Sequence, residues 1–256
     1  MSLSSLAESL QAKLPSLSAA QRLKLLRAEI PGRLVLTTSF GVEDQALTHL
    51  IVEADLDIEL VTLDTGRMFP ETYDVWRQTE QRYGRRVRAF YPDGGALEAL
   101  VAAQGVDGFY ESVAQRHACC DVRKVQPLAR ALAGAQGWAT GLRATQSQNR
   151  AGMEFASFEA TRGLIKANPL LDWTREETAE FCRSHDVPVN ALHAKGFPSI
   201  GCAPCTRAVA PGEDERAGRW WWEASDKECG LHVDEQGRLV RAAAPKDGVA
   251  KGRVEP

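Results

Sequence analysis

A repeated order of buried strand, short turn and helix constrains the fold of this chain more than any other feature. Apolar segments of strand length occupy 34–38, 58–63, 86–91 and 137–142. Segments with helical periodicity separate them, at 70–83 and 121–133 among others. Strands that are joined by helices usually run parallel in one sheet. The sequence therefore predicts an α/β fold with an open, mainly parallel sheet and helices on both faces.

Local signals divide the chain into three parts. Capping boxes at Ser18–Gln21 and Thr174–Glu177 predict two helix starts, and the first helix belongs to an N-terminal helical extension, 1–30. The α/β domain is expected at 31–205. From 206 to 256 we expect a loop-rich C-terminal segment, although 213–222 has a spacing that suits a short helix.

Four of the six cysteines form two pairs, Cys119-Cys120 and Cys202-x-x-Cys205. A C-x-x-C turn presents two thiolates to one soft metal centre, and a second pair completes a four-sulfur site. Zinc sites usually separate paired ligands by two to four residues, whereas adjacent residues have Cα atoms about 3.8 Å apart and diverging side chains. This favours an iron–sulfur cluster, and a zinc site is the alternative.

Polar turns follow the first two strands. Ser39-Phe40-Gly41-Val42-Glu43-Asp44 leads into a helix, so its amides can face an anion while Ser39 adds a hydroxyl. Asp64-Thr65-Gly66 follows the second strand, and both turns are expected at the edge of the sheet where ligands bind. Many such turns bind nothing, and Asp64 could instead cap its own turn.

Arginines are candidates for binding a phosphate or a sulfate. Arg143 and Arg150 lie in a polar loop after the fourth strand, where forked hydrogen bonds to an anion are possible. Arg216 and Arg219 are three residues apart within 213–222, hence on one face of the short helix expected there. A solvated loop is the alternative for the first pair.

Cys229 has no C-x-x-C partner and precedes a glycine. A nucleophilic cysteine must be a thiolate, which cations favour, and Lys227 and His232 are close in sequence. Lys124 follows Cys120 by four residues, about one helical turn, and would offset negative charge near the thiolates. The alternatives are an ordinary surface cysteine and a solvated lysine.

The two cysteine pairs and the pentad Glu228-Cys229-Gly230-Leu231-His232 together resemble the assimilatory sulfonucleotide reductases. The match is to the iron–sulfur branch of the APS/PAPS reductase family, which reduces adenosine 5′-phosphosulfate (APS), and it runs from about Ser39 to His232. The resemblance implies an adenine-nucleotide α-hydrolase-like (PP-loop) fold, with the Ser-Phe-Gly turn as a modified pyrophosphate loop. It also implies one [4Fe-4S] cluster on Cys119, Cys120, Cys202 and Cys205.

The same resemblance implies a mechanism and a set of site residues. Cys229, aided by His232 and Lys124, attacks the sulfate sulfur and becomes an S-sulfocysteine, from which thioredoxin or glutaredoxin releases sulfite. Substrate binding is expected from the turns and arginines above, namely Ser39, Phe40, Gly41, Glu43, Asp44, Asp64, Thr65, Gly66, Arg143, Arg150, Arg216 and Arg219. We expect the cluster to act structurally and electrostatically, because a dithiol supplies both electrons.

Three other readings explain part of the sequence. A 3′-phosphoadenylyl-sulfate (PAPS) reductase keeps the pentad of Cys229 but lacks the four cluster cysteines. An ATP pyrophosphatase of the related fold, adenylating or thiolating, usually carries Ser-Gly-Gly-x-Asp-Ser, from which the loop at Ser39 departs. A zinc-stabilised binding module would leave Cys229 and the arginine loop unexplained.

Composition limits the partners and the compartment. A net charge of −3 gives no signature of nucleic-acid binding, and no apolar run approaches the length of a membrane span. The first residues lack the layout of a signal peptide, so a cytoplasmic protein is expected, in which cysteines serve metal or catalysis. The run Trp220–Trp222 is interpreted as a packing anchor and Cys182 as a core residue. The oligomeric state stays open, a homo-oligomer included.

Overall fold

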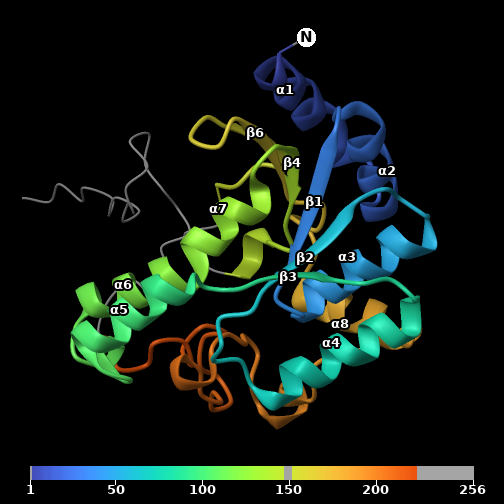
Figure 1. Cartoon of the computed structure of the whole chain (residues 1–256). Coiled ribbons are helices and arrows are strands. Elements are labelled where there is room, and N and C mark those ends of the chain that lie inside the picture. Colours follow the sequence, from blue (N-terminus) through green and yellow to red (C-terminus); the bar gives the residue numbers. More distant parts are fainter. Residues whose placement is uncertain (1, 147–151, 224–256) are drawn as a thin grey trace, which may run out of the picture.

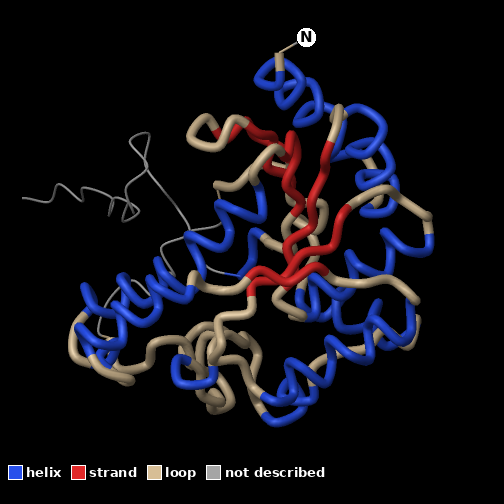
Figure 2. The backbone as a smooth tube through the Cα atoms, viewed as in Figure 1, coloured by secondary structure: helices blue, strands red, loops and turns tan. Residues whose placement is uncertain are grey.

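The computed structural model describes residues 2–146 and 152–223 of the 256-residue chain, and all structural statements refer to these residues. Their strands form one sheet in the order β3-β2-β1-β4-β6-β5. The pairs from β3 to β6 are parallel, and β5 runs antiparallel to β6 at the edge. Figures 1 and 2 show helices on both sides of this sheet. The predicted open, mainly parallel α/β sheet is therefore confirmed.

The strands are β1 (Arg33–Thr38), β2 (Glu59–Leu63), β3 (Arg88–Phe90), β4 (Ala135–Ala139), β5 (Ala156–Glu159) and β6 (Leu164–Ala167). The α-helices are α1 (Leu3–Lys13), α2 (Ala19–Glu29), α3 (Val42–Glu53), α4 (Pro70–Tyr83), α5 (Gly94–Gln104), α6 (Val113–Cys120), α7 (Gln126–Leu132) and α8 (Arg175–Ser184). The strand predicted at 137–142 ends early, at Ala139, because the following residues form a loop against the start of α3.

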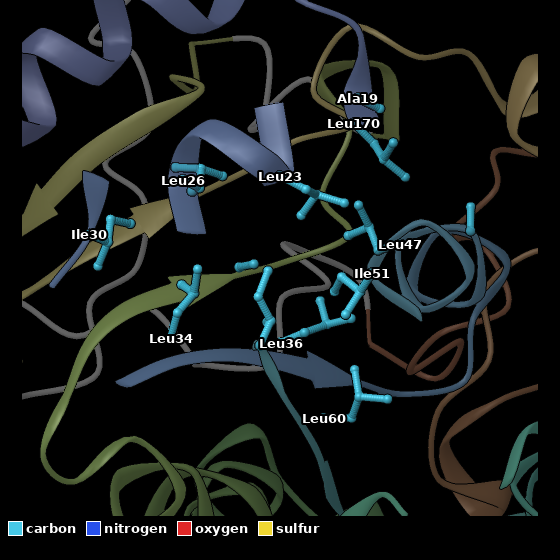
Figure 3. Packing of buried hydrophobic residues seen from close by; sticks show 14 of the residues in the cluster. Ala19, Leu23, Leu26, Ile30, Leu34, Leu36, Leu47, Ile51, Leu60 and Leu170 are labelled. Atoms are coloured by element: carbon cyan, nitrogen blue, oxygen red, sulfur yellow. The ribbon is translucent and has the colours of Figure 1, made fainter. Parts of the chain in front are cut away.

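The two faces of β1 bury different groups of apolar side chains. Leu34 and Leu36 belong to the cluster formed with α1, α2, α3 and α8, as Figure 3 shows for Leu23 and Leu47. Val35 points to the opposite face and packs with residues of α7, because successive side chains of a strand alternate. Both faces are covered, so the carboxyl ends of the strands are where a ligand can reach the sheet.

The N-terminal helices pack onto the same core. The predicted capping box at Ser18 opens α2, and the additional helix α1 buries Leu6 and Leu10. Arg22 of α2 is 2% exposed and bonds both carboxylate oxygens of Asp172, at 2.5 and 2.7 Å. The Arg22 guanidinium holds the pKa of Asp172 below its ordinary value. This ion pair ties α2 to the segment before α8.

The cysteine pair Cys119-Cys120 lies inside a long helical segment. The sequence predicts a helical stretch that reaches Cys119-Cys120 and a helix from 121, and α6 confirms the first, beginning at Val113, where the Ser112 side chain accepts a hydrogen bond from the amide of Gln115. A π-helical stretch, 121–125, joins α6 to α7 without a break. Such stretches are often found at functional sites. Both cysteines are therefore fixed on a helix directly before this widened turn.

The helix predicted at 213–222 is absent, and that expectation is wrong. The amide of Arg207 bonds to the carbonyl of Gly218, and that of Trp220 to the carbonyl of Cys205. Thr206 and Arg219 form an antiparallel bridge. Pairing with a distant segment thus replaces the local helical periodicity. None of the helices in residues 2–146 and 152–223 has the length and apolar character of a membrane span.

Candidate active site

A cavity of about 310 Å³ lies at the edge where β1, β2, β4 and β6 end. Its size is in the range of small-ligand sites. The predicted site residues that line it are Ser39, Gly41, Glu43, Asp44, Thr65, Lys124, Arg216 and Arg219. Phe40, Asp64, Gly66 and Arg143 lie outside its lining. Arg150, Cys229 and His232 lie outside the described residues.

The loop between β1 and α3 is shaped by its own side chains. Asp44 accepts hydrogen bonds from the amide and the hydroxyl of Ser39, at 2.7 and 2.9 Å. Burial raises the pKa of Asp44 to about 6, against the opposing effect of the Ser39 bonds. Phe40 has a φ of 59°, is buried, and stacks on Trp76 at 5.5 Å. The Ser39 hydroxyl therefore organises the loop in addition to facing the cavity.

Gly141 lets the loop after β4 touch this first loop. A Cβ atom at Gly141 would lie 2.4 Å from Asp44 Oδ1 and 2.9 Å from Glu43 Cβ. Only a residue without a side chain fits at such a distance. The close approach explains why β4 ends before Thr140 and places two strand ends on one wall of the cavity.

Arg143 joins three segments of the wall instead of lining the cavity. It is 1% exposed, its Nε donates to Glu43 at 2.8 Å, and its Nη1 donates to Thr145 at 2.7 Å. Its Nη2 lies 3.3 Å from a carboxylate oxygen of Glu215. Two protein carboxylates thus offset its charge. A contact between Arg143 and a bound anion stays a prediction.

The turn after β2 connects the cavity to the cysteines. The Asp64 carboxylate accepts hydrogen bonds from the Gly66 amide at 2.8 Å and the Tyr73 hydroxyl at 2.9 Å. Asp64 therefore caps its own turn, the alternative that the sequence left open. The Thr65 hydroxyl lies 3.3 Å from Cys202 Sγ. Thr65 lines the cavity and contacts a predicted metal ligand at the same time.

A second, smaller cavity is lined by Cys119, Cys120, Cys202 and Cys205. No disulfide joins the described cysteines. The end of α6 supplies one pair, and a 3-10 turn, Ala203–Cys205, supplies one member of the other. Within residues 2–146 and 152–223, no group of three or more His, Cys, Asp or Glu side chains is arranged to hold a metal ion. The four cysteines share a cavity without converging on one point.

Four cations line the cysteine cavity, namely Arg67, Arg116, Arg123 and Lys124. Sequence reasoning identified only Lys124. Arg123 is 7% exposed and donates to the Thr65 carbonyl at 2.6 Å. Arg116 is 1% exposed and binds Glu223 through two hydrogen bonds, at 2.7 and 2.8 Å. Spacing could have found both, because each lies about one helical turn from the cysteine pair.

The thiols of this cavity differ in their acidity. Burial raises the pKa of Cys205 to about 12, and it also raises the pKa of Cys119 despite the nearby Arg123. Burial also acts to raise the pKa of Cys202, but nearby cations, Lys124 first, and the hydrogen bond with the Thr65 hydroxyl act against it, and the pKa is lowered. A site with four thiolates therefore needs a positively charged centre between them.

The two cavities share a wall. Lys124, Cys202 and Trp220 line both of them. The larger cavity also has two basic lining residues that sequence reasoning missed, Lys166 and His193. Lys166 places Nζ 4.8 Å from the centre of the Trp138 ring. His193 directs Nδ1 to the Phe197 carbonyl at 2.8 Å. No sequence pattern points to either residue, because Lys166 meets Trp138 on another strand and His193 lies in a short 3-10 turn.

Comparison with known proteins agrees with this geometry. Residues 33–208 match the phosphoadenosine phosphosulfate reductase domain. An adenosine 5′-phosphosulfate reductase of Sinorhizobium fredii (strain USDA 257) is 54% identical over 235 residues, which cover 91% of this chain and 93% of that protein. The enzyme of the same name from Allochromatium vinosum is 52% identical over 200 residues, 78% of each chain.

Solved structures support the same assignment. Phosphoadenylyl-sulfate reductase from Candida auris, a phosphate complex, has a TM-score of 0.68 and 26% identity over 79% of this chain and 96% of that one. Yeast FAD synthetase, with a TM-score of 0.50 and 16% identity over 81% and 77%, shares the fold alone. The fold is thus the PP-loop type that the resemblance implied. The chain belongs to the phosphoadenosine phosphosulfate reductase domain family.

Proposed function

We propose that this chain reduces APS to sulfite and AMP in assimilatory sulfate reduction. The observation that carries the proposal is the shared wall between a nucleotide-sized cavity and a cavity lined by four cysteines. Relatives that are 46–55% identical over most of the chain and are named adenosine 5′-phosphosulfate reductases support the substrate. The Ser39 loop and the cations opposite it supply the polar groups that a sulfonucleotide needs.

Cys119, Cys120, Cys202 and Cys205 would hold a [4Fe-4S] cluster. Consecutive side chains on a helix diverge by about 100°, so Cys119 and Cys120 suit two corners of a cluster better than one small ion. Four lining cations fit the negative charge of a thiolate-bound centre. When bound, such a cluster supplies a fixed charge and orders the two cysteine-bearing segments.

Lys124, Arg216 and Arg219 are the cations that we assign to the phosphosulfate. All three line the larger cavity, and Lys124 also lines the smaller one beside Cys202. Cations hold phosphate and sulfate oxygens through charge-assisted hydrogen bonds. They also stabilise the negative charge that develops on the AMP leaving group. The sulfate end of the substrate is therefore expected at the wall next to the cysteines.

Cys229 is the proposed nucleophile, and its role is carried by the sequence because it lies outside the described residues. Its thiolate attacks the sulfate sulfur, the bond to the phosphate oxygen breaks, and AMP leaves with the electron pair. A thiolate of thioredoxin or glutaredoxin then attacks the Cys229 sulfur and displaces sulfite. The second thiol of the reductant releases Cys229 and forms a disulfide, which supplies the two electrons. His232 is the proposed neighbour that favours the Cys229 thiolate, and the cytoplasm keeps the reductant in its dithiol form.

Sulfite release from APS and from PAPS, each with a thioredoxin system, tests the proposal. We expect sulfite from APS and a clear preference for it over PAPS. A preference for PAPS would support the alternative that the Candida auris relative represents. Release of pyrophosphate from ATP with no sulfite from either nucleotide would indicate the pyrophosphatase class instead.

A further inference from the structure

Trp220 forms part of the wall between the two cavities. It is 1% exposed, is the largest of the fully buried side chains, and lines both cavities. Its neighbour Trp221 is 39% exposed and contacts Tyr110 and Trp222. The three consecutive tryptophans therefore have different roles, and Trp220 is the one at the site.

Arginines from both cavities contact the Trp220 ring. Arg219 and Arg216 of the larger cavity have their Cζ atoms 4.7 and 6.0 Å from the ring centre. Arg116 of the cysteine cavity has its Cζ atom at 4.8 Å. A guanidinium within about 6 Å of a tryptophan ring is attracted by its electron density, most strongly where water is excluded. The ring therefore limits where these arginines can lie.

The backbone at Trp220 is held in an uncommon conformation by the cysteine segment. Its φ is 42°, in the left-handed region that large side chains rarely adopt. The Trp220 amide donates to the carbonyl of Cys205, and the preceding residue, Arg219, forms a bridge with Thr206. A strained backbone conformation that neighbouring residues maintain is a reason to consider a functional role. Here the neighbours are Cys205 and Thr206, at the end of the predicted metal-binding turn.

Gly201 gives independent evidence that the position of Arg219 matters. A Cβ atom at Gly201 would lie 2.2 Å from the Arg219 Nη2 atom. Arg219 is 6% exposed and lies against the backbone directly before Cys202. The guanidinium is thus confined between the Trp220 ring and the backbone of the cysteine loop.

We propose that Trp220 is a positioning residue, which holds Arg219 and Arg216 where the sulfate of the substrate binds and Arg116 against the cysteine pair. Recognition of the sulfate then depends on order in the Cys202–Cys205 turn, because that turn holds Trp220. The inference rests on the proposed function, since the sulfate of APS is the group that the arginines meet. It adds a residue that acts on the substrate through the arginines that it holds.

Equilibrium binding of AMP and APS separates this role from a purely structural one. Anaerobic holoprotein carrying Cys229→Ser, which prevents covalent reaction, serves as the parent. The ratio of the AMP and APS dissociation constants reports the sulfate contact alone. In Trp220→Leu we expect this ratio to fall about five- to tenfold, the range that one or two buried cation–π contacts correspond to. Iron content and the affinity for AMP should stay near those of the parent.

Two further variants keep the test decisive. Trp220→Phe retains a weaker ring, so its ratio should fall about two- to threefold, between the parent and Trp220→Leu. Trp221→Leu removes an adjacent tryptophan of the same size and should leave the ratio unchanged. The inference would be overturned if the ratio of the AMP and APS dissociation constants were the same in the Trp220 variants as in the parent. It would also be overturned if Trp221→Leu lowered this ratio as much as Trp220→Leu. If Trp220→Leu loses its iron, Trp220→Phe decides by the same criterion.

The parent protein separates failure of this inference from failure of the proposed function. If the parent binds APS more tightly than AMP and the Trp220 variants do so to the same degree, only the role of Trp220 is contradicted. A parent that binds both nucleotides equally contradicts the proposed function, and the inference fails with it.

Discussion

The two adjoining cavities are built in different ways. The nucleotide-sized cavity is the larger one, at the ends of β1, β2, β4 and β6. Short-range contacts hold the loop that lines it, because Asp44 accepts hydrogen bonds from Ser39, five residues earlier. The cysteine cavity is assembled from α6 and from a turn more than eighty residues later, Cys202–Cys205. The loop of Ser39 and Asp44 is held by β1 and α3, although residues 198–202 and Trp220 line another part of the first cavity. The second cavity depends wholly on the C-terminal described segment folded over α6. We therefore expect the Ser39 loop and the cysteine cavity to fail separately.

Their electrostatics differ as well. On the nucleotide side, burial raises the pKa of Asp44, and Arg143 is offset by Glu43 and Glu215. On the cysteine side, four cations line the cavity, of which Arg116 is paired with Glu223 and Arg67 with Asp107. Carboxylates therefore offset arginines beside both cavities. The second cavity differs in its four thiols, which would add negative charge among these cations when ionised.

The largest effect is expected from Cys229→Ser. Removing the nucleophile should lower turnover of APS by on the order of a thousandfold or more. Iron content and AMP affinity should stay at the wild-type level, because Cys229 is not one of the four cysteines assigned to the cluster and is assigned no contact with AMP. Loss of iron in this variant would show that the ligands are misassigned. Sulfite release, iron analysis and AMP titration on one preparation measure turnover, cluster content and AMP affinity, respectively.

Cys202→Ser should disable the cysteine cavity and leave the loop of Ser39 and Asp44 in place, although Cys202 lines both cavities. Loss of one thiolate is expected to abolish cluster retention and turnover, since hydroxyl oxygen is a poor ligand for such a centre. AMP affinity should change by no more than about threefold, because the loop of Ser39 and Asp44 is held locally. Isothermal titration with AMP checks this. A loss of AMP binding together with iron would contradict the separation of the two cavities.

Gly141→Ala should weaken nucleotide binding and spare the cysteine cavity. The new Cβ would meet Glu43 Cβ at 2.9 Å and the Asp44 amide at 3.1 Å, neither of which can move cheaply. We expect AMP affinity to fall about 5- to 150-fold, the effect of about 1–3 kcal/mol of steric strain in a packed site. Iron content should be unchanged. Gly201→Ala is the matched control, because the atoms nearest to its Cβ belong to the Arg219 guanidinium instead of Glu43 or Asp44, so it should spare AMP binding.

The smallest effect concerns pH. The pKa of Asp44 is raised in the folded protein from 3.8 to about 6, so its contribution to stability is present at low pH and is lost as pH rises from about 4 to 6. Such a shift bounds the effect at about 3 kcal/mol, and we expect about 1–2 kcal/mol because water reaches the cavity.

Asp44→Asn removes this titration and keeps an oxygen that can accept from Ser39. Its midpoint of thermal unfolding should exceed that of the wild type at pH 7.5, and the difference should shrink towards pH 4.5. Unfolding followed by circular dichroism at several pH values measures this. A difference that does not vary with pH would show that burial of the Asp44 charge is not the cause.

Local chemistry predicted most of the fold. The capping boxes at Ser18 and Thr174 open α2 and α8, and α4 spans Pro70–Tyr83 with Gly84 in the left-handed conformation, as its sequence indicated. Cys182 is a core residue, as interpreted. These features depend on residues three or four apart or on burial alone. The four predicted strands are present with shifted ends.

Long-range pairing explains what the sequence could not give. The segment 213–222 has helical spacing, but backbone bonds to 205–207 hold it in turns. The position of Arg116 beside the cysteine pair follows from helical spacing, but its ion pair with Glu223 and its contact with Trp220, more than a hundred residues away, do not. Asp64 caps its turn, one of the two roles that the sequence left open, and its role in binding stays a prediction. Cavity-lining residues were therefore predictable where they follow strand ends, and not where a distant loop completes the wall.

Iron and acid-labile sulfide content of anaerobically purified protein shows whether the second cavity is the site of a cluster that adjoins a nucleotide. We expect about four irons and four sulfides per chain, with a visible absorption spectrum to match. Colourless protein that contains zinc and lacks sulfide would contradict it, because Cys119-Cys120 and Cys202-x-x-Cys205 would then form a structural site unrelated to sulfate reduction.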